Sequence, residues 1–171
     1  VLAHADTHAD PAVRCELVAA LASAAGPAGM VGGQMIDLIA ETTSLDIGAI
    51  TRLQRMKTGA LIAFSCEAGA ILAKAPAEPR MALHGYAHDL GLAFQIADDL
   101  LDVEGSAEET GKPVGADAAA GKATFVSILG IERARSQAEL LVVQAVAHLD
   151  LFEQRAELLR QIARFVVSRR T

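Results

Sequence analysis

The apolar residues of this chain recur with helical spacing along nearly its whole length. Apolar positions fall three and four residues apart, and no stretch alternates convincingly with a period of two. This spacing gathers apolar side chains on one face of a helix, whereas a half-buried strand requires alternation. The sequence therefore predicts an all-α fold, with helices over about residues 11–25, 29–41, 46–73, 77–103, 123–148 and 152–169.

Glycine, proline and hydroxyl residues mark the expected breaks between these helices. Gly26-Pro27 separates the first two helices, and Thr43-Ser44 offers an N-cap before the third. Within the third helix, Lys57-Thr58-Gly59 is expected to loosen or bend the backbone, because glycine follows a β-branched hydroxyl residue. A glycine-rich irregular segment is expected from about residue 104 to 122, and loops of this length are often functional.

Length and charge narrow the classes of function. A chain of 171 residues can bury a core and is most simply one domain. The net charge of −6 argues against general nucleic-acid binding, which needs a concentrated basic surface. No apolar run reaches the roughly 20 residues of a membrane-spanning helix, and no signal-peptide pattern opens the chain. We therefore expect a cytoplasmic protein that binds no nucleic acid and does not span a membrane.

Three carboxylates interrupt an otherwise apolar stretch near the end of the fourth predicted helix. Asp98, Asp99 and Asp102 lie, together with Gln95, within an arc of roughly 100° on one helical face. Like charges at this spacing weaken a helix unless a cation lies between them. Oxygen ligands without His or Cys suit a hard ion such as Mg²⁺, which keeps open positions for a substrate phosphate. The alternative is a solvated acidic patch.

Other polar residues occur where apolar patterning does not require them. Gln34 and Asp37 share one face of the second predicted helix, and Lys57 interrupts the third. Lys112 and Lys122 each follow a glycine in the irregular segment. Each of these alone has a structural explanation, such as a lysine whose stem packs on apolar surface or a side chain in solvent. The order in which these residues follow one another along the chain is a more specific signal than any one of them alone.

This order resembles that of the trans-isoprenyl diphosphate synthases, and in particular the short-chain type that makes farnesyl diphosphate in bacteria. The motifs are, in order, Gly33-Gln34-x-x-Asp37-Leu38, Lys57-Thr58, Phe94-Gln95-x-x-Asp98-Asp99-x-x-Asp102, Gly111-Lys112 and Gly121-Lys122. The resemblance extends from about residue 24 through the last predicted helix. It implies an antiparallel helical bundle of the isoprenoid synthase type around a deep cavity, and a homodimer in the full-length protein.

The resemblance also implies a reaction and a metal cofactor. Members of this family join an allylic diphosphate to isopentenyl diphosphate head to tail, by ionisation, condensation and elimination. The carboxylate cluster matches the family's second aspartate-rich motif. In this comparison Asp98 and Asp102 hold Mg²⁺, and Asp99 is a further ligand or a support for the other two.

The remaining motif residues are expected to surround the substrates. The implied diphosphate ligands are Lys57 and Lys112, with Lys122 as a weaker candidate. The implied dipoles toward the carbocation are the Thr58 hydroxyl, the Gln95 side-chain oxygen and the Lys57 carbonyl. The implied cavity residues are Phe94, which contacts isopentenyl diphosphate, and Gln34 and Asp37, of which Asp37 orients Lys57.

The earlier half of the family pattern has no counterpart in this sequence. A first DDxxD motif, and the basic residues that hold isopentenyl diphosphate, are not found before residue 24. We therefore expect residues 1–171 to be the C-terminal portion of one all-helical synthase domain, inactive as an isolated polypeptide. The length of the prenyl product stays open, because in this family it depends on residues beside that first motif.

Two alternatives share the same helical architecture. A non-catalytic partner subunit of this fold has no need to keep every charged residue of a site, and this alternative is opposed by the intact Lys57, Thr58, Gln95, Asp98, Asp102 and Lys112. A terpene cyclase on the related fold has a metal motif rich in Asn, Ser and Glu, which is not found in this sequence. The motifs therefore favour a prenyltransferase.

Overall fold

The computed structural model describes residues 1–40, 42–43, 45–104 and 123–169. These residues form helices and no strand, which confirms the all-α prediction. The elements are α1 (Pro11–Ala25), α2 (Met30–Ala40), α3 (Ile47–Gln54), the π turn η1 (Arg55–Gly59), α4 (Ala60–Leu72), α5 (Ala77–Glu104), α8 (Phe125–Leu129), α9 (Ile131–Ala147), the 3₁₀ helix η2 (Asp150–Ala156) and α10 (Glu157–Ser168).

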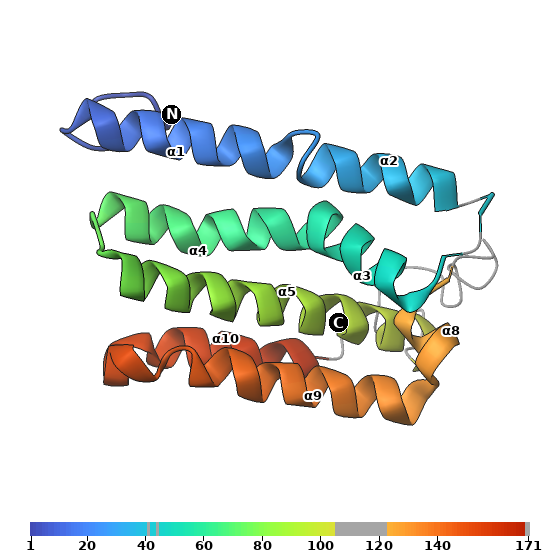
Figure 1. The fold of residues 1–171 in the computed structure, drawn as a ribbon. Helices are drawn as coiled ribbons and strands as arrows, with labels where there is room; N and C mark the ends of the chain where they lie inside the picture. Colours follow the sequence, from blue (N-terminus) through green and yellow to red (C-terminus); the bar gives the residue numbers. More distant parts are fainter. Residues whose placement is uncertain (41, 44, 105–122, 170–171) are drawn as a thin grey trace.

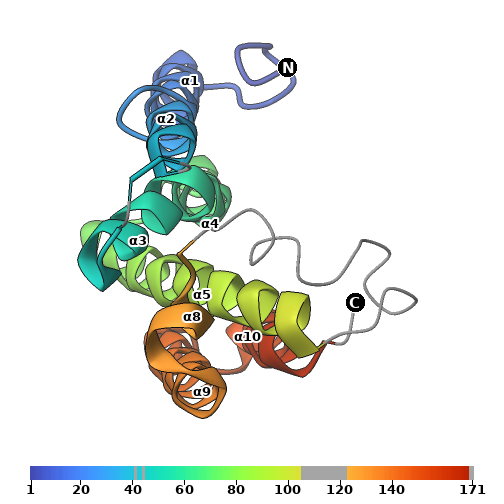
Figure 2. The ribbon, with the colours of Figure 1, turned by 90° about the vertical axis from the view of Figure 1, so that its right-hand side faces the viewer.

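The helices stack in layers that run in alternating directions along the chain from α1 to α9, whereas α10 runs in the same direction as α5, which it contacts (Figure 1). Helices α1 and α2 lie end to end and form the first layer, and α3 and α4 form the layer below it. Helix α5 lies between the layer of α3 and α4 and the pair α9 and α10 (Figure 2). Helix α5 has 28 residues and contacts α3, α4, α8, α9 and α10. This central position carries the carboxylates, at the C-terminal end of α5, toward α3 and α8.

Two clusters of buried apolar side chains hold the layers together. The larger cluster joins α5 to α9 and α10 around Tyr86, which is fully buried and donates its hydroxyl to the carbonyl oxygen of Leu159 at 2.8 Å. Burial raises the pKa of Tyr86 to about 12, because the charged phenolate is disfavoured away from water. The smaller cluster joins α1 to α4 through Val13, Leu17 and Ile71.

The predicted helix boundaries agree with the structure within one or two residues for the first four helices. The predicted N-cap at Thr43-Ser44 is wrong, since α3 begins after Asp46, whose side chain accepts a hydrogen bond from the Ala49 amide at 2.8 Å. The helix predicted over 123–148 is divided at Gly130, whose φ of 80° ends α8. The helix predicted over 152–169 begins instead as the 3₁₀ helix η2.

The N-terminal layer is apolar on its exposed side. In α2 only Gly33 is buried, while Val31, Met35, Leu38 and Ile39 are more than half exposed.

Contrary to the sequence-based expectation, the stretch Pro11–Ala40 is long and apolar enough to cross a membrane by length and composition. In the structure this stretch is two helices separated by a turn over residues 26–29, and α1 packs on α4. We therefore assign no membrane span to it.

Candidate active site

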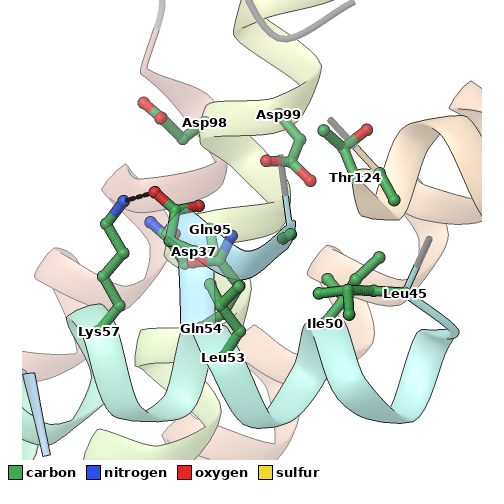
Figure 3. A pocket seen from close by; sticks show the side chains of 12 residues that line it. Asp37, Leu45, Ile50, Leu53, Gln54, Lys57, Gln95, Asp98, Asp99 and Thr124 are labelled. Carbon is green, nitrogen blue, oxygen red and sulfur yellow. Dashed lines mark hydrogen bonds and ion pairs between the residues drawn. The ribbon is translucent and has the colours of Figure 1, made fainter. Parts of the chain in front are cut away.

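A cavity of about 130 Å³ lies where α2, α3, η1 and α5 meet the start of α8 (Figure 3). Its lining combines charged and amide side chains with an apolar floor. The lining residues are Asp37, Ala40, Leu45, Ile50, Leu53, Gln54, Lys57, Gln95, Asp98, Asp99, Ala123 and Thr124. The cavity therefore brings together five of the residues predicted from the sequence, on three different elements: Asp37, Lys57, Gln95, Asp98 and Asp99.

Lys57 enters this cavity from a π turn. The predicted irregularity in the third helix is confirmed, because residues Arg55–Gly59 form the π turn η1 between α3 and α4. Such turns occur mostly as short insertions in α-helices and frequently at functional sites. The Lys57 Nζ donates to the Asp37 carboxylate of α2 at 2.7 Å, with the lysine side chain 33% exposed and that of Asp37 13% exposed. The ion pair aims the ammonium group at the cavity (Figure 3).

Gly33 sets the distance between α2 and this turn. A Cβ atom at Gly33 would lie 2.3 Å from the backbone nitrogen of Lys57 and 2.8 Å from the carbonyl carbon of Met56. Backbone atoms cannot give way as a flexible side chain can. The absence of a side chain at Gly33 therefore lets α2 approach η1 closely enough for Asp37 to reach Lys57.

Substituting Gly33 with alanine is expected to force α2 away from η1 and to lower the free energy of unfolding by about 1–3 kcal/mol. Gly69 provides a matched control, because it lies within α4 and a Cβ atom there would meet nothing within 4 Å. Gly69→Ala should instead raise stability by about 0.5–1 kcal/mol, as expected inside a helix. Urea unfolding of both full-length variants, followed by circular dichroism, checks the prediction. Equal effects at the two glycines would contradict it.

The three carboxylates of α5 differ in their surroundings. Asp98 lines the cavity and its side chain is 43% exposed. Asp99 also lines the cavity, but the residue is only 7% exposed and its carboxylate accepts the Phe125 backbone N–H at 2.8 Å. This hydrogen bond links the first residue of α8 to α5. Asp102 is 4% exposed and does not line the cavity.

The carboxylates fit Mg²⁺ only as part of a larger ligand set. Within the part of the chain that the structure describes, no group of three His, Cys, Asp or Glu residues is close enough to hold a metal ion. Mg²⁺ is usually bound through one or two carboxylates together with substrate phosphates, and it keeps several waters. Asp98, with Asp99 beside it, fits that mode because both are hard oxygen donors at one cavity. Asp102 stays a predicted ligand.

The other predicted residues lie apart from the cavity lining or outside the described residues. Gln34 is exposed on α2, and Thr58 is half-buried in η1. Phe94 is half-buried on α5, where the guanidinium carbon of Arg169 lies 4.2 Å from the centre of its ring. Lys112 and Lys122 fall within residues 105–122, which are outside the described part of the chain. The roles assigned to all of these residues stay predictions.

The polar side chains of Gln54 and Arg169 had not been predicted to lie at the site. Gln54 lines the cavity, and its side-chain oxygen is buried without a hydrogen-bond partner among the described residues. Its spacing of three residues from Lys57 is a signal that the sequence offers, since positions i and i+3 share a helical face. Arg169 follows the last helix, and no local pattern connects it with α5.

Comparison with known proteins identifies the family. A model of the polyprenyl synthetase family matches residues 5–162. The chain belongs to the polyprenyl synthetase family. Farnesyl diphosphate synthase of Geobacillus stearothermophilus is 41% identical over 144 residues, covering 84% of this chain and 48% of that protein. Farnesyl diphosphate synthase of Bacillus subtilis is 35% identical over 169 residues, covering 99% of this chain and 57% of that protein.

Solved structures of this family have the same fold. The apo structure of a FPP/GFPP synthase from Zymomonas mobilis is 53% identical, with a TM-score of 0.86 over 97% of this chain and 55% of that one. A geranyltransferase from Helicobacter pylori, complexed with magnesium and isoprenyl diphosphate, is 31% identical with a TM-score of 0.78. It is matched over 93% of this chain and 52% of its own length. The chain thus spans about half the length of the polyprenyl synthetases it matches.

Proposed function

We propose that the full-length protein is a short-chain trans-isoprenyl diphosphate synthase, and that the cavity described above binds the diphosphate group of the allylic substrate as it leaves the allylic carbon. The observation that carries this proposal is the convergence of Lys57, Gln95, Asp98 and Asp99 on one cavity in a polyprenyl synthetase chain. A lysine opposite carboxylates that can hold a metal is suited to a diphosphate, which needs positive charge from several directions. The substrates follow from the family: an allylic diphosphate and isopentenyl diphosphate.

In the proposed reaction the carbon–oxygen bond of the allylic diphosphate breaks first. Its electron pair leaves with the diphosphate, and the double bond of isopentenyl diphosphate then attacks the resulting carbocation. Loss of a proton to the released diphosphate forms the new double bond, so no His or Cys of the protein is required. The product is the longer allylic diphosphate, with inorganic diphosphate released.

The residues of this chain act mainly on charge. The Lys57 ammonium binds the diphosphate oxygens as negative charge develops on them, and Asp37 holds the lysine in place. Asp98 and Asp102 are the proposed ligands of Mg²⁺, with Asp99 as a further ligand or a support for the other two, and the ion would supply further positive charge to the leaving group. The side-chain oxygen of Gln95 directs a negative dipole toward the carbocation without being a strong nucleophile. As the family resemblance implies, the Thr58 hydroxyl is proposed to direct a second dipole toward the carbocation, and Lys112 to bind the diphosphate.

We propose further that the full-length protein is a cytoplasmic homodimer. The homodimer follows from the family resemblance, and the exposed apolar side chains on α2 support only a contact with further polypeptide surface, from the rest of the full-length protein or from a second copy, because patches of this kind are seldom left in water. The acidic net charge supports a protein without nucleic-acid partners.

An assay of prenyl transfer tests this function against the alternative of a non-catalytic partner subunit. The purified full-length protein is incubated with geranyl diphosphate, radiolabelled isopentenyl diphosphate and Mg²⁺, and the products are separated after dephosphorylation. We expect label in a longer prenyl alcohol, and no product when EDTA removes the metal. A folded protein that forms no product alone, but stimulates a second synthase chain, would support the partner-subunit function instead.

A further inference from the structure

Arg169 lies beside the candidate active site, in contact with Asp98 and Phe94, although it belongs to none of the sequence motifs that predicted the site. It is the first residue after α10, and its backbone N–H donates to the Phe165 carbonyl at 2.9 Å. There the chain leaves the helix with an extended backbone (φ −64°, ψ 149°). The side chain points back against α5, where it is only 15% exposed.

The guanidinium group makes two contacts with site residues of α5. Its central carbon lies 4.2 Å from the centroid of the Phe94 ring, within the range of a cation–π interaction. Its Nη2 lies 3.6 Å from Oδ1 of Asp98. This distance is too long for a good hydrogen bond but short enough for charge attraction. Stacking on the ring therefore holds a positive charge next to the most exposed carboxylate of the cavity.

The hydrogen-bonding capacity of Arg169 is incompletely used. Its Nε and Nη2 atoms are buried and have no hydrogen-bond partner among the described residues. The nearby acid Glu104 is paired with Arg135 instead, whose Nη2 donates to both of its oxygens, at 2.8 and 2.6 Å. A buried charged donor without an acceptor is costly. An anionic ligand next to Asp98 would provide the missing acceptors.

We propose that Arg169 is a positioning residue that makes binding of a divalent cation at Asp98 depend on diphosphate. A bare cation at Asp98 meets the repulsion of the guanidinium, whereas a cation that arrives with diphosphate brings more negative than positive charge. Arg169 therefore disfavours the metal alone and favours the metal together with its anion. This inference rests on the proposed function of the site, and it adds a coupling that the family resemblance does not assign to any residue.

Calorimetric titration of Mg²⁺ into the full-length protein, with and without inorganic diphosphate, measures this coupling. In Arg169→Gln we expect Mg²⁺ alone to bind about fivefold more tightly, and diphosphate-dependent Mg²⁺ binding to weaken at least about fivefold. The size is of the order that Coulomb's law in water gives for a single charge acting on a divalent ion several ångströms away. Arg169→Lys keeps the charge, so its coupling should stay within about twofold of the wild type. Arg164→Gln is the matched control, since Arg164 lies on α10, is 61% exposed and pairs with Glu157.

The outcomes separate this inference from the proposed function. If the wild type binds Mg²⁺ equally with and without diphosphate, the proposed function of the site is wrong and the inference fails with it. If the wild type shows the coupling but Arg169→Gln keeps it in full, the inference alone is overturned. Loss of coupling in Arg169→Lys as large as in Arg169→Gln would also overturn it, because the charge would then not be the cause. Circular dichroism melting of each variant shows that the comparison is made between folded proteins.

Discussion

Replacing Lys57 with alanine in the full-length protein is expected to lower the turnover number by about 10²- to 10³-fold. The loss is large because the ammonium group acts on the diphosphate most strongly as the carbon–oxygen bond breaks, and one preorganised electrostatic contact commonly contributes this much. The KM for the allylic diphosphate should change far less than turnover. Steady-state kinetics of prenyl transfer, with both substrates varied, provides the measurement.

A second lysine provides the control for this substitution. Lys74 lies after α4, and its Nζ donates to Asp10 at 2.6 Å at an exposed position remote from the cavity. Lys74→Ala removes the same charge from the same protein, and its turnover should stay within about twofold of the wild type. A loss under about threefold in Lys57→Ala would refute the role assigned to Lys57.

Replacing Asp98 with asparagine is expected to have a comparable effect on turnover, about 10²- to 10³-fold, because it removes a metal-binding charge with little change in shape. It should also weaken the diphosphate-dependent binding of Mg²⁺, measured by calorimetry in the absence of turnover. Asp89→Asn is the matched control on the same helix, since Asp89 contacts His148 at 3.2 Å and lies outside the cavity lining. If Asp98→Asn binds Mg²⁺ and diphosphate as the wild type does, Asp98 is not a metal ligand.

The sequence predicted the long helices well because their apolar spacing is set by burial on one face. The fourth predicted helix, residues 77–103, corresponds to α5 at Ala77–Glu104, which is buried between two layers along most of its length. Breaks that depend on single backbone angles were harder to predict. Gly130 ends α8 with a positive φ, and Glu153 adopts a φ of 50° within η2, although no turn motif precedes either residue.

The site was predictable to the extent that it is built within one helix. Gln95, Asp98 and Asp99 share a face because helical geometry fixes their spacing, and all three line the cavity. The same geometry did not predict the burial of Asp102, which depends on the residues packed around the end of α5. The pairing of Asp37 with Lys57 was expected from the family resemblance and depends on the close approach of α2 at Gly33. Arg169 could not be found from spacing, because its place is set by where α10 ends against α5.

The central claim is that this cavity holds the diphosphate of the allylic substrate together with its metal. A crystal structure of the full-length protein with Mn²⁺ and an allylic thiolodiphosphate, which ionises slowly, tests it most directly. We predict anomalous density for Mn²⁺ in contact with the Asp98 carboxylate and the diphosphate, and the Lys57 ammonium within hydrogen-bond distance of a diphosphate oxygen. Diphosphate bound at another place, with no metal density at Asp98 and Lys57 still paired only with Asp37, would contradict the account.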